Sequence, residues 1–372
     1  MKLKILHVTQ FLGIGGLEKI LMLLIKEQTK ANHQVELLVY DYEQTWVEYF
    51  RSQGIIVHSD FRKKEGFDSN AVKFMNGYVK DFDVIHTHDL NPLIYMSTVK
   101  FLRFLKGQSF PRFVHTAHGM DHINRRPITK AYEKICSYLN DATIGVSPAI
   151  KDYYIKTLLL NRDKVFNINN GTGIENEEEY KESIKLKLRT SLKIPNHQKI
   201  WTTVARIVPL KRQHLLIEAV RNRCDVSLIL VGPSGDPEYW EKINNHIPDN
   251  VHILGARSDI NEILSGSDFF VSASSHEGIP VAALEAGAKR LTCLLSDIPG
   301  HLILEKDSPK EVAFYFKKDN LEDLVRQMIF VEQNPKLSQS YADNFLQHIE
   351  KNFSAETMSQ RYNQVYLGEY VK

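Results

Sequence analysis

Short apolar segments alternate along the chain with longer segments whose apolar residues recur at helical spacing. The short segments predict buried strands, and the longer ones predict helices that cover a sheet. The helical pattern is clearest at Leu17–Lys30, where Leu21 and Leu24 would share one face. The predicted strands are Ile5–Val8, Val35–Val39, Ile55–His58, Val84–His86, Phe113–Thr116, Thr143–Val146, Val165–Ile168, Ile200–Val204, Leu228–Val231, Val251–Leu254, Phe269–Ala273 and Leu291–Leu295.

The order of these elements predicts an α/β protein with two doubly wound parallel sheets, one in each half of the chain. Between the halves lie the glycine-containing segment Asn169–Gly173 and the polar run Glu175–Lys187, which together predict a linker and a solvated helix. The tail, Ser354–Val371, predicts a last helix with Ser354 as its cap. We therefore expect two domains and a C-terminal helix.

Composition narrows the class of protein. The chain has 372 residues, of which 43% are hydrophobic, which is enough for two domains with proper cores. Its formal net charge of +2 is too small to indicate a nucleic-acid partner. Three scattered cysteines give neither a disulfide framework nor a metal-ligand spacing, so a reducing compartment is favoured. The N-terminus predicts a strand rather than a signal peptide, and no apolar run is long enough to span a membrane, so we expect a cytoplasmic location.

Two glutamates eight positions apart, Glu277 and Glu285, frame the most informative segment. Pro280 suits the first turn of a helix, because proline has no amide hydrogen and its φ is already helical. Glu277 would then lie before the helix and Glu285 inside it, with backbone amides at the helix start available to an anion. One carboxylate could bind sugar hydroxyls and the other a ribose, which indicates a nucleotide-sugar site. The candidate contacts are Glu277, Gly278, Ile279, Pro280, Val281 and Glu285.

In isolation, both glutamates could be solvated charges at a helix end. The apolar strand before them, Asp268–Ala273, favours function, because open α/β sheets bind ligands at the carboxyl ends of their strands. Arg206 and Lys211 follow another strand across a proline turn and could converge on one diphosphate. Basic residues near strand ends are usually solvated, so this assignment depends on the glutamate motif.

Two glycine-containing loops add weaker indications. Phe11–Gly16 follows the first strand and opens a helix, so its amides could approach a phosphate, although a tight turn explains it about as well. Its glycine spacing does not match a dinucleotide fingerprint. The backbone of the loop Gly255–Asp259 could contact a nucleobase. A helix-capping turn, with Ser258 or Asp259 as the cap, explains the sequence of this loop equally well. The candidate substrate contacts in these loops are Gly15, Gly16, Gly255 and Arg257.

Histidines end two predicted strands, at His86 and His88 and again at His115 and His118. Histidine is the commonest metal ligand, so the set allows a metal hypothesis. No carboxylate or cysteine stands at a metal-ligand spacing from them, and we predict no metal site. Hydrogen bonding to a sugar is the favoured role, with His118 as the candidate residue.

Together these motifs resemble the retaining glycosyltransferases of family 4, which have the GT-B architecture. The segment from Glu277 to Glu285 is similar to the family's glutamate pair, and the other motifs stand in the family's order, although Lys289 and Arg290 replace small residues. The resemblance implies two Rossmann-like domains facing a cleft. Their expected bounds are residues 1–170 on the acceptor side, residues 171–352 for the nucleotide sugar, and residues 353–372 for a helix that crosses back to the first domain. The implied catalytic residues are Glu277, His118, Arg206 and Lys211.

The resemblance implies transfer of a sugar from a nucleoside diphosphate sugar, with uridine as the family's usual base, to a hydroxyl of a saccharide or lipid-linked acceptor. It implies retention at the anomeric carbon, surface-polysaccharide or glycolipid assembly, and no cofactor beyond the donor. The D-x-D triplet at Asp81 and Asp83 lies at the wrong end of a strand to hold a metal, so it predicts a polar turn. A sugar-nucleotide epimerase and a non-catalytic nucleotide-sugar-binding protein share the architecture and remain alternatives.

The segment Tyr95–Lys106 raises the question of a membrane surface. Lys100, Arg103 and Lys106 stand at helical spacing beside an apolar stripe, a pattern that favours binding to an anionic membrane surface. An ordinary crossover helix, with its apolar face on the sheet and its basic face in water, explains the pattern equally well. Because family members use lipid-linked acceptors, we predict a cytoplasmic protein with peripheral, salt-sensitive membrane binding.

Overall fold

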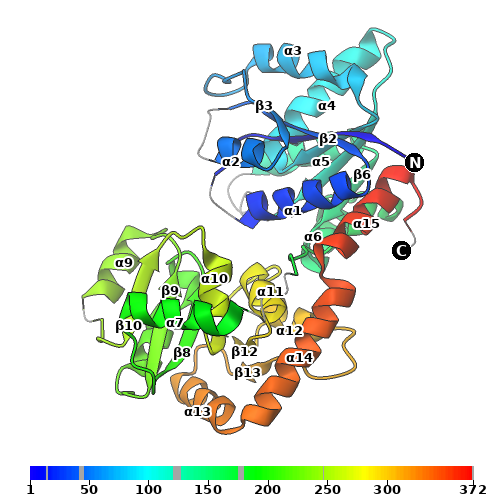
Figure 1. The fold of residues 1–372 in the computed structure, drawn as a ribbon. Coiled ribbons are helices and arrows are strands. Elements are labelled where there is room, and N and C mark those ends of the chain that lie inside the picture. The colour runs from blue at the N-terminus through cyan, green and yellow to red at the C-terminus, as the bar shows by residue number, and fades with distance from the viewer. Residues whose placement is uncertain (14–15, 42–45, 120–126, 175–179, 246, 371–372) are drawn as a thin grey trace. The chain divides into compact units, whose positions relative to one another are not determined.

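The computed structural model describes residues 1–13, 16–41, 46–119, 127–174, 180–245 and 247–370. The chain forms two compact units, one of Met1–Gly171 with Ala355–Lys372 and the other of Thr172–Ser354. Each unit contains one parallel β-sheet with helices on both faces (Figure 1). The predicted α/β class, with two doubly wound parallel sheets, is therefore confirmed.

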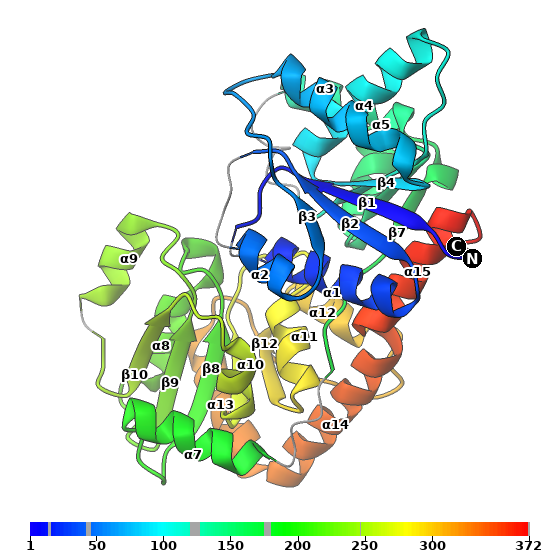
Figure 2. The same cartoon turned by 45° about the horizontal axis from the view of Figure 1, so that its top comes forward.

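In the described part of the first unit, seven parallel strands follow the order β3-β2-β1-β4-β5-β6-β7 (Figure 2). The central strand β1 aligns Ile5 with Val35 of β2 and with Val84 of β4. Because the strands are parallel, their carboxyl ends meet at one edge of the sheet. The strands are β1 (Lys4–Thr9), β2 (Gln34–Val39), β3 (Ile56–His58), β4 (Val84–His88), β5 (Arg112–Ala117), β6 (Ala142–Gly145) and β7 (Val165–Asn167).

Two groups of helices cover this first sheet. One face packs against α3, α4 and α5 through a cluster that includes Met75, Leu93 and Phe113. On the other face, α1 packs beside α15. The predicted helix at Leu17–Lys30 is confirmed as α1. The helices and short turns of this unit are α1 (Gly16–Lys30), α2 (Trp46–Ser52), α3 (Ser69–Tyr78), η1 (Val79–Asp81), α4 (Leu90–Leu105), α5 (Pro127–Leu139), α6 (Pro148–Asp152), η2 (Tyr153–Thr157), η3 (Arg162–Lys164) and α15 (Ala355–Leu367).

The C-terminal helix α15 belongs to the first unit although it follows the second in sequence. It buries Tyr362 and Tyr366, and the Sδ atom of Met358 accepts a hydrogen bond from the Gly171 amide at 3.2 Å. As predicted, the helix follows Ser354. The last residues of the predicted tail, 371–372, lie outside the described residues, and so do residues 175–179 of the predicted polar run.

The described part of the second unit has six parallel strands in the order β10-β9-β8-β11-β12-β13. Helices α8, α9 and α13 pack on one face, and α7, α10, α11 and α14 pack on the other. The last strand, β13, is absent from the predicted strands, although it lies in an apolar run at residues 312–316. The strands are β8 (Lys199–Val204), β9 (Val226–Val231), β10 (Val251–Gly255), β11 (Phe269–Ser272), β12 (Thr292–Ser296) and β13 (Phe314–Phe316).

Local signals set the helix starts of this unit. Asp236 caps α9 by accepting a hydrogen bond from the Tyr239 amide at 2.9 Å, with Pro237 in the first turn. No helix among the described residues is long and apolar enough to cross a membrane. The helices and short turns are α7 (Lys181–Leu192), η5 (Pro209–Lys211), α8 (Gln213–Val220), α9 (Pro237–Asn244), α10 (Ile260–Ser265), α11 (Val281–Ala288), α12 (Pro299–Leu302), η6 (Ile303–Glu305), α13 (Leu321–Gln333) and α14 (Pro335–Asn352).

Candidate functional site

The loops at the carboxyl ends of β8 and β11 bring two of the predicted catalytic residues together. Lys211, at the end of η5, forms an ion pair through Nζ with Oε1 of Glu277, in the loop after β11. The hydroxyl of Ser274 donates to the same carboxylate oxygen at 2.7 Å. Both side chains of the ion pair are largely buried. The second unit therefore holds a cation and an anion in fixed positions at the ligand-binding edge of its sheet.

Arg206 lies in the loop between β8 and η5 and is exposed. Within the described residues, the structure gives its guanidinium no acidic partner, so this charge is available to a ligand. Its backbone oxygen accepts a hydrogen bond from Nε2 of Gln213 at 2.9 Å. Gly232 supports the same turn, since a Cβ there would lie 2.0 Å from the oxygen of Ala205, and its φ is +144°. Gln213 and Gly232 thus hold the Arg206 backbone in place.

Gly300 supports Glu277 in a similar way. A Cβ at Gly300 would lie 2.3 Å from the backbone oxygen of Glu277, so only glycine allows the two loops to approach this closely. The neighbouring His301 is fully buried, and its Nδ1 lies 2.8 Å from the backbone oxygen of Ser296. Its Nε2 is buried and has no hydrogen-bond partner among the described residues. The sequence gives no reason to select Gln213 or Gly232, because their contacts depend on other loops.

The start of α11 differs in detail from the prediction. Pro280 occupies the N-cap with ψ 85°, so it precedes the helix rather than opening its first turn. Its carbonyl accepts hydrogen bonds from the Ala283 and Leu284 amides, and the Val281 amide donates to the Ile279 oxygen. Three of the amides in this segment therefore already have acceptors.

The remaining predicted residues of this segment have different surroundings. Ile279 is buried in the apolar cluster around Leu284, so its side chain faces the core rather than solvent. Gly278 is exposed, with open space where a Cβ would be. Glu285 lies on α11 and is half-buried, as expected from its predicted place inside the helix.

The loop after β10 is open to solvent. Gly255 has φ +64°, and its oxygen accepts a hydrogen bond from the Gly232 amide at 2.8 Å. Arg257 forms a two-pronged ion pair with Asp259, with distances of 2.8 Å and 2.5 Å. Asp259 stands at the N-cap of α10, but its side chain makes no capping hydrogen bond. The arginine is therefore engaged by its neighbour, while the backbone of Gly255 is linked to the loop that supports Arg206.

In the first unit, His118 lies just beyond the carboxyl end of β5 and is partly buried. Its amide donates to Oδ1 of Asp89 at 3.3 Å. The nearby glycine loop is fastened by Glu18, whose Oε1 accepts a hydrogen bond from the Gly13 amide at 2.8 Å. Gly16 begins α1 with open space around it, and Gly15 lies outside the described residues.

Three buried histidines, His7, His86 and His88, are the one group among the described residues that could hold a metal ion, with ligand atoms within 4.8 Å of one another. Every ring nitrogen of the three nevertheless has a hydrogen-bond partner. Burial lowers the pKa of His7 to about 4 and the pKa values of His86 and His88 well below 6.5. The group therefore forms a satisfied network of neutral rings. The D-x-D residue Asp83 instead accepts a hydrogen bond from the Lys4 amide at 2.8 Å.

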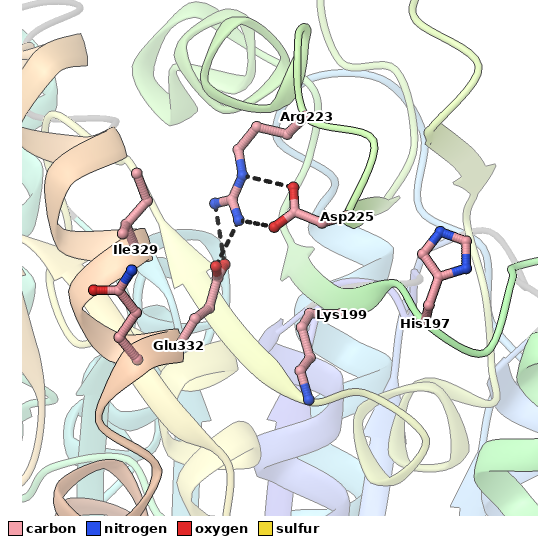
Figure 3. A pocket seen from close by; sticks show the side chains of 7 residues that line it. His197, Lys199, Arg223, Asp225, Ile329 and Glu332 are labelled. Carbon is pink, nitrogen blue, oxygen red and sulfur yellow. Dashed lines mark hydrogen bonds and ion pairs between the residues drawn. The ribbon is translucent and has the colours of Figure 1, made fainter.

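A separate hollow of about 470 Å³ lies in the second unit (Figure 3). It lies at the amino ends of β8 and β9, because Lys199 begins β8 and Asp225 directly precedes β9. Arg223 in this hollow is bound by Asp225 and Glu332 at 2.6 Å and 2.5 Å. The two carboxylates neutralise the charge of Arg223. The hollow lies at the sheet edge opposite Lys211, so it is not part of the candidate site.

Two family models together span most of the chain. The model for Glycosyltransferase Family 4 matches residues 14–176, and the model for Glycosyl transferases group 1 matches residues 184–347. The chain belongs to the family 4 glycosyltransferases of GT-B type. Lys211 and Glu277 thus lie within the second matched region of this glycosyltransferase, and His118 lies within the first.

Two curated relatives of the glycosyltransferase carry undecaprenol-linked sugars in their names. It is 26% identical over 277 residues to the UDP-Gal:alpha-D-GlcNAc-diphosphoundecaprenol alpha-1,3-galactosyltransferase of Escherichia coli, covering 69% of this chain and 68% of the relative. It is 35% identical over 116 residues to the N,N'-diacetylbacillosaminyl-diphospho-undecaprenol alpha-1,3-N-acetylgalactosaminyltransferase of Campylobacter jejuni, covering 31% of this chain and 30% of the relative.

Solved structures support the fold. HepE of Anabaena, in complex with UDP-glucose, matches 98% of this glycosyltransferase and 100% of its own chain with a TM-score of 0.81 and 18% identity. A glycosyltransferase of Rickettsia africae matches 99% of this chain and 98% of its own with a TM-score of 0.81 and 18% identity. The predicted GT-B fold is confirmed by these similarities, which at this level of identity concern the fold alone.

Proposed function

We propose that this glycosyltransferase transfers a sugar, with retention at the anomeric carbon, from a UDP-sugar to a hydroxyl of a lipid-linked saccharide. The observation that carries the proposal is the Lys211–Glu277 ion pair, together with the exposed Arg206, which has no acidic partner among the described residues; all three residues lie in loops at the carboxyl edge of the second sheet. This arrangement offers two positive charges to a diphosphate and one carboxylate to sugar hydroxyls. The complex of HepE with UDP-glucose supports uridine as the base, and the E. coli relative supports the acceptor class.

Each of these residues has a distinct role in the proposal. Arg206 and Lys211 neutralise the charge that builds on the departing diphosphate, which is where stabilisation lowers the barrier. Glu277, held by Lys211 and by Ser274, accepts hydrogen bonds from the donor sugar. Glu285 binds the ribose. The first unit supplies the acceptor side, and its His118 is in addition a ligand for a hydroxyl of the donor sugar or for the positive charge that develops on that sugar.

Retention requires either a protein nucleophile or attack on the face that the diphosphate leaves. We propose front-face attack, with the departing diphosphate taking the proton of the acceptor hydroxyl. The hydrogen bonds to Oε1 of Glu277 hold that oxygen as an acceptor and support a binding role rather than a nucleophilic one. The anomeric configuration of the product, measured by proton NMR, tests this step, and an inverted product contradicts it.

The proposal includes no metal, because Arg206 and Lys211 supply the positive charge that a divalent ion would supply. Turnover should survive excess EDTA. If EDTA abolishes turnover and Mn²⁺ or Mg²⁺ restores it, the roles of Asp81, Asp83 and the buried histidines must be revised.

We also propose that the enzyme acts in the cytoplasm, bound peripherally to an anionic membrane that carries its acceptor. The structure corrects the expected surface: Lys100 is partly buried and pairs with Asp141 at 3.3 Å, and Arg103 donates to Oδ1 of Asn76 at 3.2 Å. The exposed residues at the end of α4 are instead apolar, with Phe104 75% exposed.

The neighbouring helix α5 extends this apolar surface. It exposes Ile128, Tyr132, Ile135 and Tyr138 at the spacing of one helix face. Helices α4 and α5 pack side by side, so their exposed apolar residues belong to the same side of the first unit. Lys106, Lys130 and Lys134 flank these residues and complement anionic lipid headgroups. We call the exposed residues Phe101, Leu102, Phe104, Leu105, Ile128, Tyr132, Ile135 and Tyr138 the apolar surface of α4 and α5.

A thermal-shift screen tests the donor class directly. UDP, GDP and CDP are compared with UDP-glucose, UDP-galactose, UDP-GlcNAc and UDP-GalNAc, for the wild type and for Arg206→Ala. A ligand at 100 times its Kd stabilises the protein by about 2.7 kcal/mol, so a uridine preference that weakens in Arg206→Ala supports the proposal. No shift with any of these compounds contradicts it.

A further inference from the structure

A continuous chain of hydrogen bonds runs through the buried polar residues of the first unit. It starts at His118 and passes to His88 at 2.9 Å, from His88 to His7 at 2.9 Å, and from His7 to Gln28 at 2.8 Å. From Gln28 on α1 it continues to Tyr366 on α15 at 3.1 Å. His88, His7 and Gln28 are at most 1% exposed. The chain therefore connects a predicted catalytic residue to the C-terminal helix, entirely within one compact unit.

The chain continues beyond Tyr366. The Tyr366 hydroxyl lies 2.7 Å from Nδ1 of His86, and Nε2 of His86 lies 2.7 Å from the hydroxyl of Thr116. The Thr116 hydroxyl donates to Oη of Tyr362 at 3.3 Å. Each member between the two ends, His118 and Tyr362, has one neighbour on either side, so the orientation of one group constrains the orientation of the next.

Gln28 sets the direction of the chain. Its Oε1 faces His7 and its Nε2 donates to Tyr366. A carbonyl oxygen only accepts, so Nε2 of His7 carries a hydrogen. If each ring is neutral, Nδ1 of His7 accepts from Nε2–H of His88. By the same logic, Nδ1 of His88 accepts from Nε2–H of His118.

The rings are neutral at ordinary pH. Burial holds the pKa of His7 at about 4 and lowers the pKa values of His86, His88 and His118. A neutral imidazole carries one N–H and one lone pair, so donor and acceptor roles alternate along the chain. A half-turn of the Gln28 amide would reverse every bond and move the hydrogen of His118 to Nδ1.

We infer that Gln28, His7 and His88 are positioning residues that fix His118 as the tautomer with hydrogen on Nε2 and a lone pair on Nδ1. The described residues provide no partner for that lone pair. His118 thus presents an acceptor to a ligand, which suits a sugar hydroxyl or amide N–H and disfavours a carboxylate. The part of this inference that concerns the ligand rests on the proposed function, whereas the tautomer does not.

Long-range ¹H–¹⁵N correlation NMR on the full chain labelled with ¹⁵N-histidine tests the tautomer without any substrate. The His118 signals are assigned by their loss in His118→Asn. The expected pattern shows hydrogen on Nε2 and an unprotonated Nδ1 in the wild type. A wild-type His118 with hydrogen on Nδ1, or with two tautomers in exchange, overturns the inference regardless of how any variant folds.

A pair of variants tests whether the chain is the cause. Gln28→Leu removes the acceptor of His7, so His118 should exchange between tautomers. Tyr40→Phe is the matched control, because the Tyr40 hydroxyl is buried in the same unit and has no hydrogen-bond partner among the described residues. It should leave the His118 signals unchanged. If Gln28→Leu keeps the wild-type tautomer, the chain does not set it and the inference fails.

Kinetics separate this inference from the proposed function. With a UDP-sugar that the wild type uses, Gln28→Leu should lower kcat by about 10-fold, the loss expected when one hydrogen bond is misaligned in the transition state, with little change in the Kd of UDP. UDP-glucuronate, which carries a carboxylate, should gain relative to UDP-glucose in this variant. If the tautomer changes as expected and neither kcat nor this preference moves, His118 does not contact the donor sugar. That result contradicts the ligand part of the inference and leaves donor binding by the second unit intact.

Discussion

The two units differ in charge at the carboxyl ends of their sheets, where the second unit has charged side chains and the first has neutral ones. The second unit places charges there, with Arg206 exposed and Lys211 paired to Glu277. The first unit ends in neutral rings, because burial keeps His88 and its neighbours uncharged. Charge suits a diphosphate, whose negative charge grows as the bond to the sugar breaks, whereas a neutral acceptor suits a hydroxyl. We therefore propose that the carboxyl edge of the sheet selects its ligand by charge in the second unit and by hydrogen-bond direction in the first.

Removing the positive charges of the second unit should have the largest effect on activity. We expect Arg206→Ala and Lys211→Ala each to lower kcat/KM by about 100-fold or more, because each removes stabilisation that grows toward the transition state. Lys242 on α9 lies in the same unit and outside the candidate site, so Lys242→Ala is the matched control. Steady-state rates of UDP release measure the effect. Normal turnover in the Arg206→Ala/Lys211→Ala double variant would contradict the proposal that these two residues bind the diphosphate.

Acid should destabilise the first unit, whose buried histidines are neutral in the folded protein. Because the pKa of His7 is about 4 in the folded protein and about 6.5 unfolded, the unfolded chain binds a proton first as the pH falls. Stability of the first unit should therefore be lost from about pH 6.5 down to about pH 4, with His7 alone contributing about 3 kcal/mol. Urea unfolding at several pH values measures how the free energy of unfolding changes with pH. In His7→Phe, this dependence should decrease by the equivalent of about one bound proton. An unchanged slope in His7→Phe would show that this ring is not buried in neutral form.

Displacing Glu277 without removing its charge gives a sharper test of the second unit. Gly300→Ala places a Cβ against the Glu277 backbone, and a shift of this kind should lower kcat by about 10-fold or more. Gly77→Ala is the control, because Gly77 lies exposed in α3 with open space where a Cβ would be. Rates and circular dichroism are compared for both variants. Equal rates for Gly300→Ala and wild type would mean that the position of Glu277 is not critical.

Membrane binding should be the smallest of these effects. Co-sedimentation with anionic vesicles should fall several-fold between low and high salt, since each basic residue near the surface contributes about 1 kcal/mol. Phe104→Glu/Ile135→Glu should weaken it, whereas Ile56→Glu, at an exposed position on β3, should not. Equal recovery with neutral and anionic vesicles, or none with either, contradicts the proposed membrane contact.

Much of the fold follows from local pattern. In β9, residues 228–231 form a continuous apolar run, and α1 has a regular apolar face, so short windows of sequence contain the signal. The strand β13 lies in a similar apolar run, at residues 312–316, which the prediction omits. Pro280 illustrates a finer limit: proline fixes φ but not ψ, and the observed ψ of 85° makes it a cap rather than a first helical residue.

The candidate site could be predicted only where it depends on side-chain chemistry. Lys211 and Glu277 were selected separately as charged residues after strands, and the structure brings them into contact. Gln28 could not be selected, because its importance arises from a residue far away in sequence. The sequence marks His86 and His88 as candidates, but their place in the chain of hydrogen bonds depends on residues of α1 and α15.

The most direct test of the account is to incubate the enzyme with a UDP-sugar in excess EDTA, with and without GlcNAc-diphosphoundecaprenol, and to measure UDP and the lipid product together. UDP-galactose, UDP-GlcNAc and UDP-GalNAc form the donor panel. The account predicts that one donor yields UDP only when the lipid is present, with one glycosylated lipid formed for each UDP. Interconversion of UDP-sugars without glycosylated lipid would identify an epimerase, and donor binding without any turnover would identify a non-catalytic protein; either result would contradict the account.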